Sequence, residues 1–563
     1  MKKFFCLMLS LALTGLALDA FQLDPLDKPD HWKANGGVTV EKTAGPNGAS
    51  AMFFSHLPKG IAQLSLSFDD DVQDSFDQYQ GVSFYVKGDG SDCWETISLV
   101  HNGSYTYNYF VPLKNTDWVK YTVAWRDFIP EGQCGLIGQP GGVPPCGITT
   151  LRVGCRWKIW YDNATIPEHS IAISDIKLEP VVARPANQYR PAPFDGVLAK
   201  LKNGEPLVIQ FQGDSITAGT SLHDKVTERY SIKTEELLRN WLKNDKIRCV
   251  NRAVGGARTN DERAWLPRDF DGDVPDLVTL WIGYNDKSSC NTIAYYKQSV
   301  ADYIDRVAEI TKGRSAFLLI TPGPGKGARF TMMDDYAQAI RELAAERNLP
   351  CLDVSKLLKA FGKRDFCDTY MADTAHPNAK GHEIVADALC EYLVRAAGIT
   401  TPKPLPPPEP VVENHTSLSW DFEDALDNWI LEKNAGPTDE KAKSGKRCLK
   451  LFCAKGEKDH TRAWSQAIPV KQWQKFTVSG DMCSELEHDE GIGVYVVEYE
   501  DDEAKGTFRY PLVLMSRKST RNWSHFVSEY KVPAGVKAIR LLFWSFKTNV
   551  GTVYLDNLSI QPK

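Results

Sequence analysis

The chain has 563 residues, of which 42% are hydrophobic and 25% are charged, and its formal net charge is −6. This length exceeds what one hydrophobic core usually supports, so we expect about two to four domains. The composition excludes a largely disordered protein. No lysine- or arginine-rich run stands out, which argues against nucleic acid as the main partner.

The first residues are typical of a secretory signal peptide. A short cationic start, Met1-Lys2-Lys3, precedes an apolar run from Phe4 to Leu18, and small residues allow cleavage after Ala17 or Ala20. A membrane anchor is the less favoured alternative, because the run is shorter than the ~20 residues of a spanning helix. We therefore predict that residues 1–20 are a signal peptide and that the mature protein is secreted or periplasmic, without a membrane anchor.

Two proline-rich passages divide the rest of the chain into three segments. They occupy 184–204 and 399–413, and the second is typical of a semi-rigid extended spacer. The predicted domains are therefore 21–183, 205–398 and 414–563.

The middle segment alternates strand and helix patterns. Short runs rich in valine, isoleucine or leucine predict strands at 207–211, 247–251, 277–282, 316–320 and 350–354. Helical periodicity fills the intervals between them. Five such βα repeats indicate a parallel sheet that is covered by helices on both faces.

Both outer segments carry short alternating runs separated by turns, a pattern typical of all-β sandwiches. They also echo one another, since Asp30-His31-Trp32 resembles Asp427-Asn428-Trp429 and the hydrophobic positions of their last strands match. Two interpretations stay open. The segments are two copies of one sandwich type, or they share only a β composition.

The cysteines predict no metal site. The chain has 13 of them, but it contains neither a CxxC pair nor an HExxH sequence, so we expect no metal and no other cofactor. Cys134 and Cys146, in a loop rich in glycine and proline, are the best candidates for a disulfide. Cys249 and Cys351 lie in apolar strand-like runs and are expected to be buried free thiols.

A candidate nucleophile follows the first predicted strand of the middle segment. Ser215 stands in Gly213-Asp214-Ser215, at the carboxyl edge of the sheet, where open α/β folds build their sites. The surroundings are not a GxSxG elbow, since Thr217 occupies the place of the second glycine. A serine hydroxyl needs a base to take its proton and a third group to orient that base.

Three histidines of the middle segment could act as this base. His223 follows the serine closely, and His382 falls within the last predicted helix as a surface or packing residue. His376 precedes that helix, directly before Pro377, in a loop from which it can reach the sheet edge. Asp373 can bind one nitrogen of its ring and leave the other for the serine. In the alternative interpretation, Asp373 caps the helix and His376 is an exposed loop residue.

Other strand ends supply candidate oxyanion donors. Attack on an ester carbonyl creates an oxyanion, and the backbone N–H of Ser215 is the first donor. The second predicted strand leads into Gly255-Gly256, where a glycine lets the backbone approach a ligand. The third leads into Gly283-Tyr284-Asn285-Asp286, in which the amide of Asn285 is a donor. Plain βα turns, where glycine and asparagine are common, are the alternative.

The order of these blocks resembles the SGNH hydrolases, also called the GDSL esterase/lipase superfamily. The blocks are Gly213-Asp214-Ser215, Gly256, Gly283-x-Asn285-Asp286 and Asp373-x-x-His376. The resemblance covers about 205–398 and implies a flavodoxin-like, three-layer α/β/α domain with a five-stranded parallel sheet. Ile216 departs from the family name, which has leucine there.

The resemblance also implies a role for each residue. Ser215 is the nucleophile, Gly256 and Asn285 complete the oxyanion hole with the N–H of the serine, and Asp373 and His376 finish the triad. The family needs no metal and no cofactor for this chemistry.

The outer segments resemble jelly-roll modules of the carbohydrate-binding type, whose aromatic residues stack on sugar rings. The candidates are Trp94, Tyr105, Tyr107, Tyr109, Trp157, Trp160, Trp523 and Trp544. Strand alternation places the three tyrosines on one face. The alternative is that these aromatic residues are core residues.

These resemblances together predict a secreted esterase that removes O-acetyl groups from a polysaccharide such as xylan, mannan or pectin. The partner is then an acetylated polysaccharide or oligosaccharide. A lipase, thioesterase or arylesterase of the same superfamily is one alternative, and long apolar insertions near the site would favour it. A glycan-binding scaffold with an inactive hydrolase domain is another, and the filled catalytic positions argue against it.

Overall fold

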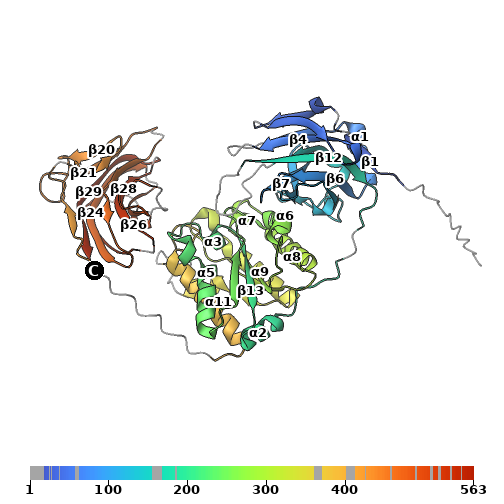
Figure 1. Ribbon diagram of the computed structural model, residues 1–563. Coiled ribbons are helices and arrows are strands. Elements are labelled where there is room, and N and C mark those ends of the chain that lie inside the picture. The colour runs from blue at the N-terminus through green and yellow to red at the C-terminus, as the bar shows by residue number, and fades with distance from the viewer. Residues whose placement is uncertain are drawn as a thin grey trace, which may run out of the picture. The chain divides into compact units, whose positions relative to one another are not determined.

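A computed structural model of the full chain gives the fold (Figure 1). It describes residues 18–563 except 25, 27, 37, 57–62, 155–167, 184–186, 361–369, 401–412, 425, 457–458, 489–490, 507–511, 518–520, 533–534 and 547. Most of the predicted signal peptide and of the spacer 399–413 therefore lies outside the described residues. None of the helices in the described part of the chain is long and apolar enough to cross a membrane.

The chain forms two compact units, which are described separately. The first contains Met1–Ala218, Asn244–Phe366 and Leu389–Ile399. The second contains Gly219–Lys243, Cys367–Ala388 and Thr400–Lys563.

The N-terminal segment folds into a β-sandwich, here called the first sandwich, within the first unit. Its elements are β1 (Phe21–Asp24), β2 (Trp32–Asn35), β3 (Thr39–Ala44), β4 (Ser50–His56), β5 (Gln63–Ser67), α1 (Asp70–Ser75), β6 (Gly81–Gly88), β7 (Trp94–His101), β8 (Tyr105–Pro112), β9 (Val119–Ala124), β10 (Ile129–Pro130), β11 (Ile148–Val153) and β12 (His169–Glu179). One sheet has the order β3-β4-β12-β6-β9 with β1 on β12, and the other has the order β10-β8-β7-β11-β5-β2.

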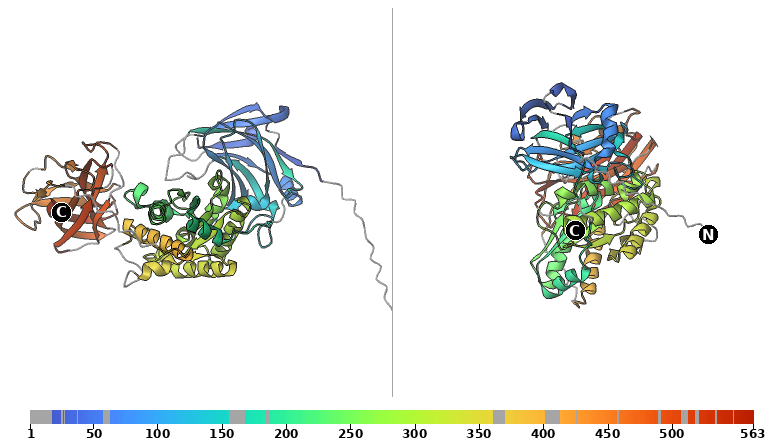
Figure 2. Two further views of the ribbon diagram at one scale, coloured as in Figure 1. Left: turned by 60° about the horizontal axis from the view of Figure 1, so that its bottom comes forward. Right: turned by 90° about the vertical axis from the view of Figure 1, so that its right-hand side faces the viewer.

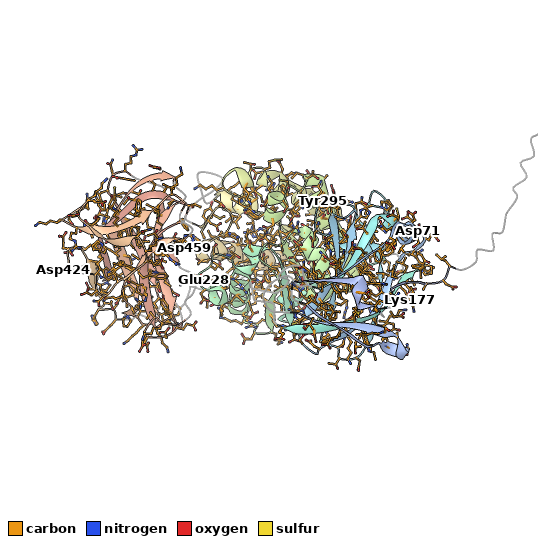
Figure 3. All side chains as sticks on the ribbon, turned by 90° about the horizontal axis from the view of Figure 1, so that it is seen from above. Asp71, Lys177, Glu228, Tyr295, Asp424 and Asp459 are labelled. Carbon is orange, nitrogen blue, oxygen red and sulfur yellow. The ribbon has the colours of Figure 1, made fainter. Side chains whose placement is uncertain are left out.

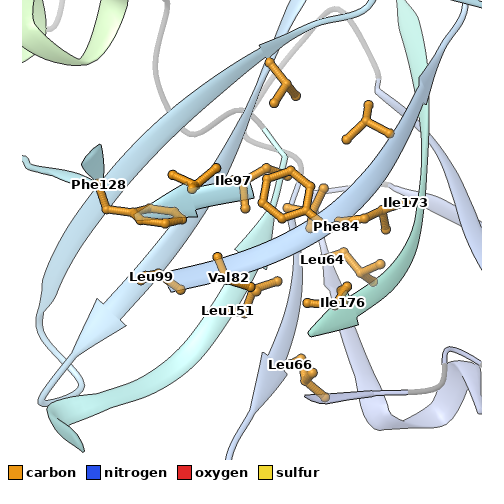
Figure 4. Close-up of a cluster of buried hydrophobic side chains, with 14 of the residues drawn as sticks. Leu64, Leu66, Val82, Phe84, Ile97, Leu99, Phe128, Leu151, Ile173 and Ile176 are labelled. Carbon is orange, nitrogen blue, oxygen red and sulfur yellow. The ribbon is translucent and has the colours of Figure 1, made fainter. Parts of the chain in front are cut away.

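The core of this sandwich lies between its two sheets. Alternate residues of each strand face inward, as the pleat of a β-strand requires. Figure 4 shows part of the cluster, with Phe84 and Ile173 from one sheet and Ile97, Leu99 and Leu151 from the other, all almost fully buried.

The middle segment contains the predicted parallel sheet. Its elements are α2 (Phe194–Asn203), β13 (Leu207–Gly213), α3 (Ser215–Ala218), α4 (Lys225–Glu228), α5 (Tyr230–Leu242), β14 (Ile247–Asn251), α6 (Thr259–Asp269), β15 (Leu277–Trp281), α7 (Tyr284–Ser288), α8 (Ile293–Ile310), β16 (Ala316–Ile320), α9 (Met333–Arg347), β17 (Cys351–Leu352), α10 (Val354–Ala360) and α11 (Ala379–Ala396). The five strands are parallel in the order β14-β13-β15-β16-β17. All five predicted strands are confirmed, and so is the α/β fold class.

Hydrophobic periodicity explains how helices cover this sheet. Helices α6, α8 and α9 pack against β15 and β16 through a cluster that includes Val278, Leu280, Val300 and Ile304. Helix α2 lies inside the predicted linker 184–204, and the sequence analysis missed it. Its Val197 and Leu201 are buried, because they form one apolar face at helical spacing.

The C-terminal segment folds into the second sandwich, within the second unit. Its strands are β18 (Leu418–Trp420), β19 (Ile430–Leu431), β20 (Ala435–Thr438), β21 (Cys448–Cys453), β22 (Thr461–Trp464), β23 (Ile468–Pro469), β24 (Lys475–His488), β25 (Ile492–Tyr499), β26 (Leu512–Arg517), β27 (Ser524–Lys531), β28 (Ala538–Ser545) and β29 (Val550–Pro562). The sheet orders are β20-β21-β29-β24-β27 with β18 on β29, and β19-β22-β28-β25-β26 with β23 on β28.

One sheet of each sandwich has the same strand order, and the other sheets match except at β10, which pairs with β8, and β23, which pairs with β28. In each, the last strand lies in the middle of one sheet and pairs with the first strand. The echoed tryptophans, Trp32 and Trp429, are both buried, and neither indole nitrogen has a hydrogen-bond partner among the described residues. Leu26 and Phe422, each just after the first strand, share a left-handed backbone, with φ of +56° and +58°. These equivalences favour the interpretation of two copies of one sandwich type.

The predicted disulfide does not form. Cys134 and Cys146 are both free thiols, because the thiol of Cys134 contacts Tyr107 and that of Cys146 contacts Asp77. The carbonyl oxygen of Cys134 lies 3.2 Å from the hydroxyl of Tyr295, and the backbone N–H of Cys146 donates to Asp77. Cys249 and Cys351 are free as expected, but they are half-buried rather than fully buried.

Candidate active site

Ser215 lies where β13 turns into the short helix α3. Gly213 ends the strand with φ of +152°, and a Cβ atom there would lie 2.3 Å from the carbonyl oxygen of Trp281, so the turn requires glycine. The buried carboxylate of Asp214 accepts a hydrogen bond from the backbone N–H of Ile216 at 3.0 Å. Ser215 is half-buried, at the sheet edge where open α/β folds bind ligands.

The loop after β14 carries the second candidate donor. The backbone N–H of Val254 donates to the carbonyl oxygen of Gly213 at 3.1 Å, so this loop runs along the end of β13. Gly256 has φ of +86°, in the left-handed region, whereas Gly255 is not among the residues with positive φ. A Cβ atom on Gly256 would meet nothing within 4 Å. Backbone conformation, rather than space, therefore favours glycine at 256.

Asn285 lies in the first turn of the short helix α7, which follows β15. Its Nδ2 atom donates a hydrogen bond to the carbonyl oxygen of Ala257 at 3.0 Å. This bond ties the amide to the loop that contains Gly256, and the second N–H of the amide is left for a ligand. The structure thus brings Ser215, Gly256 and Asn285 to the carboxyl ends of three neighbouring strands of one sheet.

Asp373 orients His376 in the segment before α11, within the second unit. Oδ2 of Asp373 lies 2.7 Å from Nδ1 of His376, and Oδ1 accepts the backbone N–H groups of Ala375 and His376, both at 2.8 Å. The hydroxyl of Ser221 also donates to Oδ2. Burial raises the pKa of Asp373, but its hydrogen bond to His376 and the charge of that ring outweigh this and lower the pKa to about 2.

This arrangement combines the two interpretations of the motif. Asp373 does bind backbone N–H groups as a cap would, and it also binds the ring of His376. Because Nδ1 is engaged, Nε2 is the ring nitrogen that can take a proton from a nucleophile.

Comparisons with known proteins bear on this site. Residues 211–384 match the model of the GDSL-like lipase/acylhydrolase family. An acetylxylan esterase from Geobacillus stearothermophilus is 25% identical over 215 residues, which make up 34% of this chain and 96% of that protein. Residues 211–384 form a GDSL-like lipase/acylhydrolase (SGNH) domain.

Solved structures include proteins similar to the SGNH domain. A crystal structure of an acetylxylan esterase from Geobacillus stearothermophilus is 23% identical, with 34% of this chain and 95% of that chain covered and a TM-score of 0.29. A two-domain esterase active on acetylated mannans, co-crystallised with mannopentaose, is 17% identical, with 67% and 96% covered and a TM-score of 0.30. Likenesses at this level carry no argument about the substrate of this chain.

The SGNH domain holds a further residue of the site that the sequence analysis did not single out. Asp286 is fully buried, and its carboxylate accepts the backbone N–H of Thr259 at 3.1 Å and Nδ2 of Asn291 at 3.1 Å. Burial raises the pKa of Asp286 to about 6 against these hydrogen bonds. Thr259 begins α6, so Asp286 connects α7, which contains Asn285, to the helix that follows Gly256. The position of Asp286 directly after Asn285 is the sequence feature that could have identified it.

The other two histidines of the domain have structural roles. His382 is fully buried, stacks on Tyr230, and accepts the backbone N–H of Tyr230 on its Nδ1 atom at 3.1 Å. Burial lowers the pKa of His382 to about 3, so the ring stays neutral. Of the two predicted roles, surface residue and packing residue, the second is confirmed. Nε2 of His223 pairs with the buried carboxylate of Glu498, and the backbone N–H of His223 donates to Glu228. Among the described residues, no group of three or more His, Cys, Asp and Glu side chains could hold a metal ion.

For several aromatic candidates, burial excludes the predicted role in sugar binding. Tyr107 belongs to the core of the first sandwich, and Tyr109 packs against it, because the face that they share is the inner face of β8. Tyr105 lies on the same face but is 52% exposed, at the start of the strand. Trp94 is buried against the SGNH domain.

The remaining aromatic candidates differ in where they lie and in how far they are buried. Trp157 and Trp160 lie outside the described residues. Trp523 is half-buried beside a small cluster of Cys448, Cys483 and Tyr554. Trp544 is half-buried on the outer face of the second sandwich and stays a prediction.

Proposed function

We propose that this protein is a carbohydrate esterase that removes O-acetyl groups from a polysaccharide. The observation that carries the proposal is the hydrogen bond from Asn285 to Ala257, which holds a side-chain donor at the strand ends that carry Ser215 and Gly256. The identity of 25% to an acetylxylan esterase, over 96% of that protein, supports an acetylated glycan as the substrate.

The reaction follows from the roles of these groups. Oγ of Ser215 attacks the acetyl carbonyl carbon, and its proton passes to Nε2 of His376. The charge on the carbonyl oxygen is stabilised by the backbone N–H groups of Ser215 and Gly256 and by Nδ2 of Asn285. The sugar hydroxyl leaves with the proton from His376, and an acetyl-enzyme remains. Water deprotonated by His376 then releases acetate and restores the serine.

Asp373 supports this cycle through its charge. A carboxylate whose pKa is lowered to about 2 stays ionised at any pH at which the enzyme would work. It therefore stabilises the imidazolium that forms when His376 takes the proton and keeps Nδ1 engaged throughout.

The test is acetate release from acetylated xylan, mannan and pectin. We expect Ser215→Ala to lose about 10³–10⁶-fold in rate, as loss of a nucleophile does. The control is Ser289→Ala, which changes an exposed serine of the same domain. Equal release by Ser215→Ala and the unmodified protein would exclude Ser215 as nucleophile.

The same assay separates the alternatives. Hydrolysis of a simple aryl acetate that depends on Ser215, with no release from any glycan, would favour a lipase, thioesterase or arylesterase. No labelling of Ser215 by a serine-reactive probe would favour a binding scaffold with an inactive hydrolase domain. Detection of the protein outside the cytoplasm, with its N-terminus after Ala17 or Ala20, would support the proposed export.

The second sandwich is proposed to bind the polysaccharide through Trp544. This side chain forms an aromatic group with His460, Tyr495 and Phe546, at ring distances of 5.1, 5.3 and 5.1 Å. Its indole N–H has no hydrogen-bond partner among the described residues. The ring is half-buried, so part of its surface is open for stacking on a sugar.

A further inference from the structure

The first sandwich is packed directly on the SGNH domain. Trp94 of β7, Phe110 of β8 and Ile129 of β10 form one buried cluster with Ala264 and Trp265 of α6. All three strands belong to the same sheet, so the outer face of that sheet lies against the helix. Figures 1 and 2 show the strands beside the helices in each view.

The same buried cluster includes two residues from the loop after β14. Val254 and Ala257 belong to it and are 4% and 1% exposed. Gly256, which lies between them in the chain, is exposed. The loop therefore buries its two apolar side chains in the interface with the first sandwich and leaves the backbone of Gly256 open to a ligand.

Residues 254–257, here called the oxyanion turn, form a β-turn. The backbone N–H of Ala257 donates to the carbonyl oxygen of Val254 at 3.1 Å. Gly256 is the third residue of the turn, and its φ of +86° matches the value of about +80° that a type II turn has at this position. The direction of the N–H of Gly256 therefore depends on how the turn is held.

Each corner of the oxyanion turn is tied to another part of the candidate site. The backbone N–H of Val254 donates to the carbonyl oxygen of Gly213, at the end of β13, at 3.1 Å. The carbonyl oxygen of Ala257 accepts a hydrogen bond from Nδ2 of Asn285 at 3.0 Å. A shift of the turn would therefore displace the N–H of Gly256 and the amide of Asn285 together.

Polar contacts hold the first sandwich against α6 and α8. The carbonyl oxygen of Gly132 accepts hydrogen bonds from Nδ2 of Asn260 at 2.8 Å and from the hydroxyl of Tyr295 at 2.9 Å. The side chain of Gln133 accepts the backbone N–H of Thr292 at 2.8 Å. Figure 3 labels Tyr295 at the side of the SGNH domain next to the first sandwich. Movement of the sandwich over the oxyanion turn would break these bonds.

The polar part of this interface is not filled. A cavity of about 450 Å³ lies between segment 133–142 of the first sandwich and helices α6 and α8, and glutamine, tyrosine, serine and charged side chains line it. Close packing between the two domains is therefore found in the apolar cluster, which contains both corners of the oxyanion turn.

This packing can control the rate of reaction without a contact to the substrate. A four-residue turn has little hydrogen bonding of its own, so its position depends on what its corners pack against. An oxyanion donor must lie about 2.7–3.1 Å from the oxygen that becomes charged. A displacement of about 1 Å can lower the rate by ~10²-fold.

We propose that the first sandwich positions the oxyanion turn and is therefore a working part of the esterase site. Trp94 and Phe110 are positioning residues in this arrangement. They bury the two corners of the turn, which hold the N–H of Gly256 and the amide of Asn285. The inference rests on the proposed function, because these donors act only when an ester is attacked.

The proposal predicts which kinetic constant changes. The oxyanion exists in the transition state and not in the bound ester, so misplaced donors lower kcat and leave KM nearly unchanged. A smaller folded fraction would lower the apparent kcat in the same way. Active serines are therefore counted by complete titration with a serine-reactive probe, and kcat is expressed per active serine.

The test compares two matched substitutions in the first sandwich. Phe110→Leu changes a ring in the interface that is 4% exposed, and Phe84→Leu changes a ring in the core between the sheets that is 0% exposed. With a simple aryl acetate, we expect kcat to fall about 10–100-fold in Phe110→Leu with KM within about twofold, and to stay within about twofold in Phe84→Leu. Unchanged kcat in Phe110→Leu, or an equal fall in Phe84→Leu, would overturn the proposal.

A second variant reaches the same contact from the turn. Val254→Ala removes two methyl groups from the cluster and keeps the backbone hydrogen bonds of the turn. It should lower kcat about tenfold and leave KM nearly unchanged. Thermal unfolding checks that each variant is folded. If Phe110→Leu does not fold, Val254→Ala decides, and unchanged kcat in that variant would overturn the proposal.

A double-mutant cycle separates positioning from stability. Asn285→Ala alone removes an oxyanion donor and should lower kcat about 10²–10³-fold. Because Phe110 acts through these donors, Phe110→Leu should lower kcat by a smaller factor in the Asn285→Ala protein than in the unmodified one. The same factor in both backgrounds would show independent effects and would overturn the positioning role.

Failure of the proposed function gives a different result. If hydrolysis of the aryl acetate depended on Ser215 but no glycan released acetate, the carbohydrate esterase would fail, and the variants would still decide the positioning role. If glycans released acetate and both Phe110→Leu and Val254→Ala kept full kcat, the esterase would stand and the positioning role would fail. Without any hydrolysis that depends on Ser215, both would fail.

Discussion

The two sandwiches share nearly all of their strand order but differ in what their equivalent outer faces carry. In the first sandwich, the outer face of the sheet with β7 and β8 presents Trp94 and Phe110, and α6 of the SGNH domain covers it. In the second, the corresponding sheet presents Trp464, Tyr495 and Trp544. The inner faces are alike because each must form a core. A similar strand order therefore does not determine what covers the outer face of such a sandwich.

The two outer faces also differ in what they contribute to the stability of the protein. The cluster around Phe110 is a hydrophobic interface within the first unit, so its residues contribute to the stability of both domains that they join. In the aromatic group around Trp544, the rings of His460, Trp544 and Phe546 are half-buried while Tyr495 is buried, so part of this face stays exposed.

The largest effect should come from the covered face. Phe110→Ala removes a ring that is 4% exposed and leaves a cavity against Trp265, so we expect a loss of about 3–5 kcal/mol in the free energy of unfolding. Urea denaturation measures it. A loss below about 1 kcal/mol, the size expected for a surface residue, would mean that the two domains do not depend on this contact.

A smaller effect should follow at the helix on which the first sandwich rests. Asp286→Asn replaces a carboxylate that accepts two hydrogen bonds by an amide that brings a donor toward Asn291, which should cost about 1–3 kcal/mol. Esterase activity should fall with it, because the start of α6 and helix α7, which contains Asn285, lose their connection.

The pH dependence of this variant checks the cause. The folded pKa of Asp286 is raised from 3.8 to about 6, so the folded state binds the proton more tightly than the unfolded state does. Its contribution to stability is therefore complete below about pH 4 and is lost as the pH rises through 6. The difference in stability between the protein and Asp286→Asn should shrink over that interval. A constant difference would show that burial of Asp286 does not set its pKa.

The smallest effect should appear on the second sandwich. Trp544→Ala should weaken binding to the polysaccharide by about 0.5–1.5 kcal/mol, the contribution of one aromatic contact. A pull-down with insoluble glycan measures it, and Val527→Ala, at an exposed position of the other sheet, is the control. Equal retention of both variants would place the glycan elsewhere, and the outer face of the second sandwich would then not be a binding surface.

Strand positions in the SGNH domain could be predicted because local pattern and tertiary role agree there. A parallel strand covered on both faces reads as a continuous apolar run, and the carboxyl end of such a run is where a site residue must stand. Ser215 and Asn285 were chosen as candidates in this way, and Gly256 was preferred on spacing; its backbone has a left-handed φ of +86°.

The error about the tyrosines arose because alternation shows which residues share a face but not what covers it. Tyr107 and Tyr109 do lie on one face, yet that face is the core. Cys134 and Cys146 lie close in the chain, but the loop between them folds on its own glycines and leaves both thiols free. Helix α2 was missed because the prolines before it predicted a spacer.

The sequence by itself determined the strands of the SGNH domain, the order of its candidate catalytic blocks and the β character of both flanks, because periodicity and turn residues are local properties. Only the tertiary structure decided that Asp286 connects α7 to the start of α6, that the first sandwich rests on α6, and that a polar cavity lies between them. Each of these depends on side chains more than 25 residues apart in the chain, as Thr259 and Asp286 are, and such pairs meet only when the sheet is assembled.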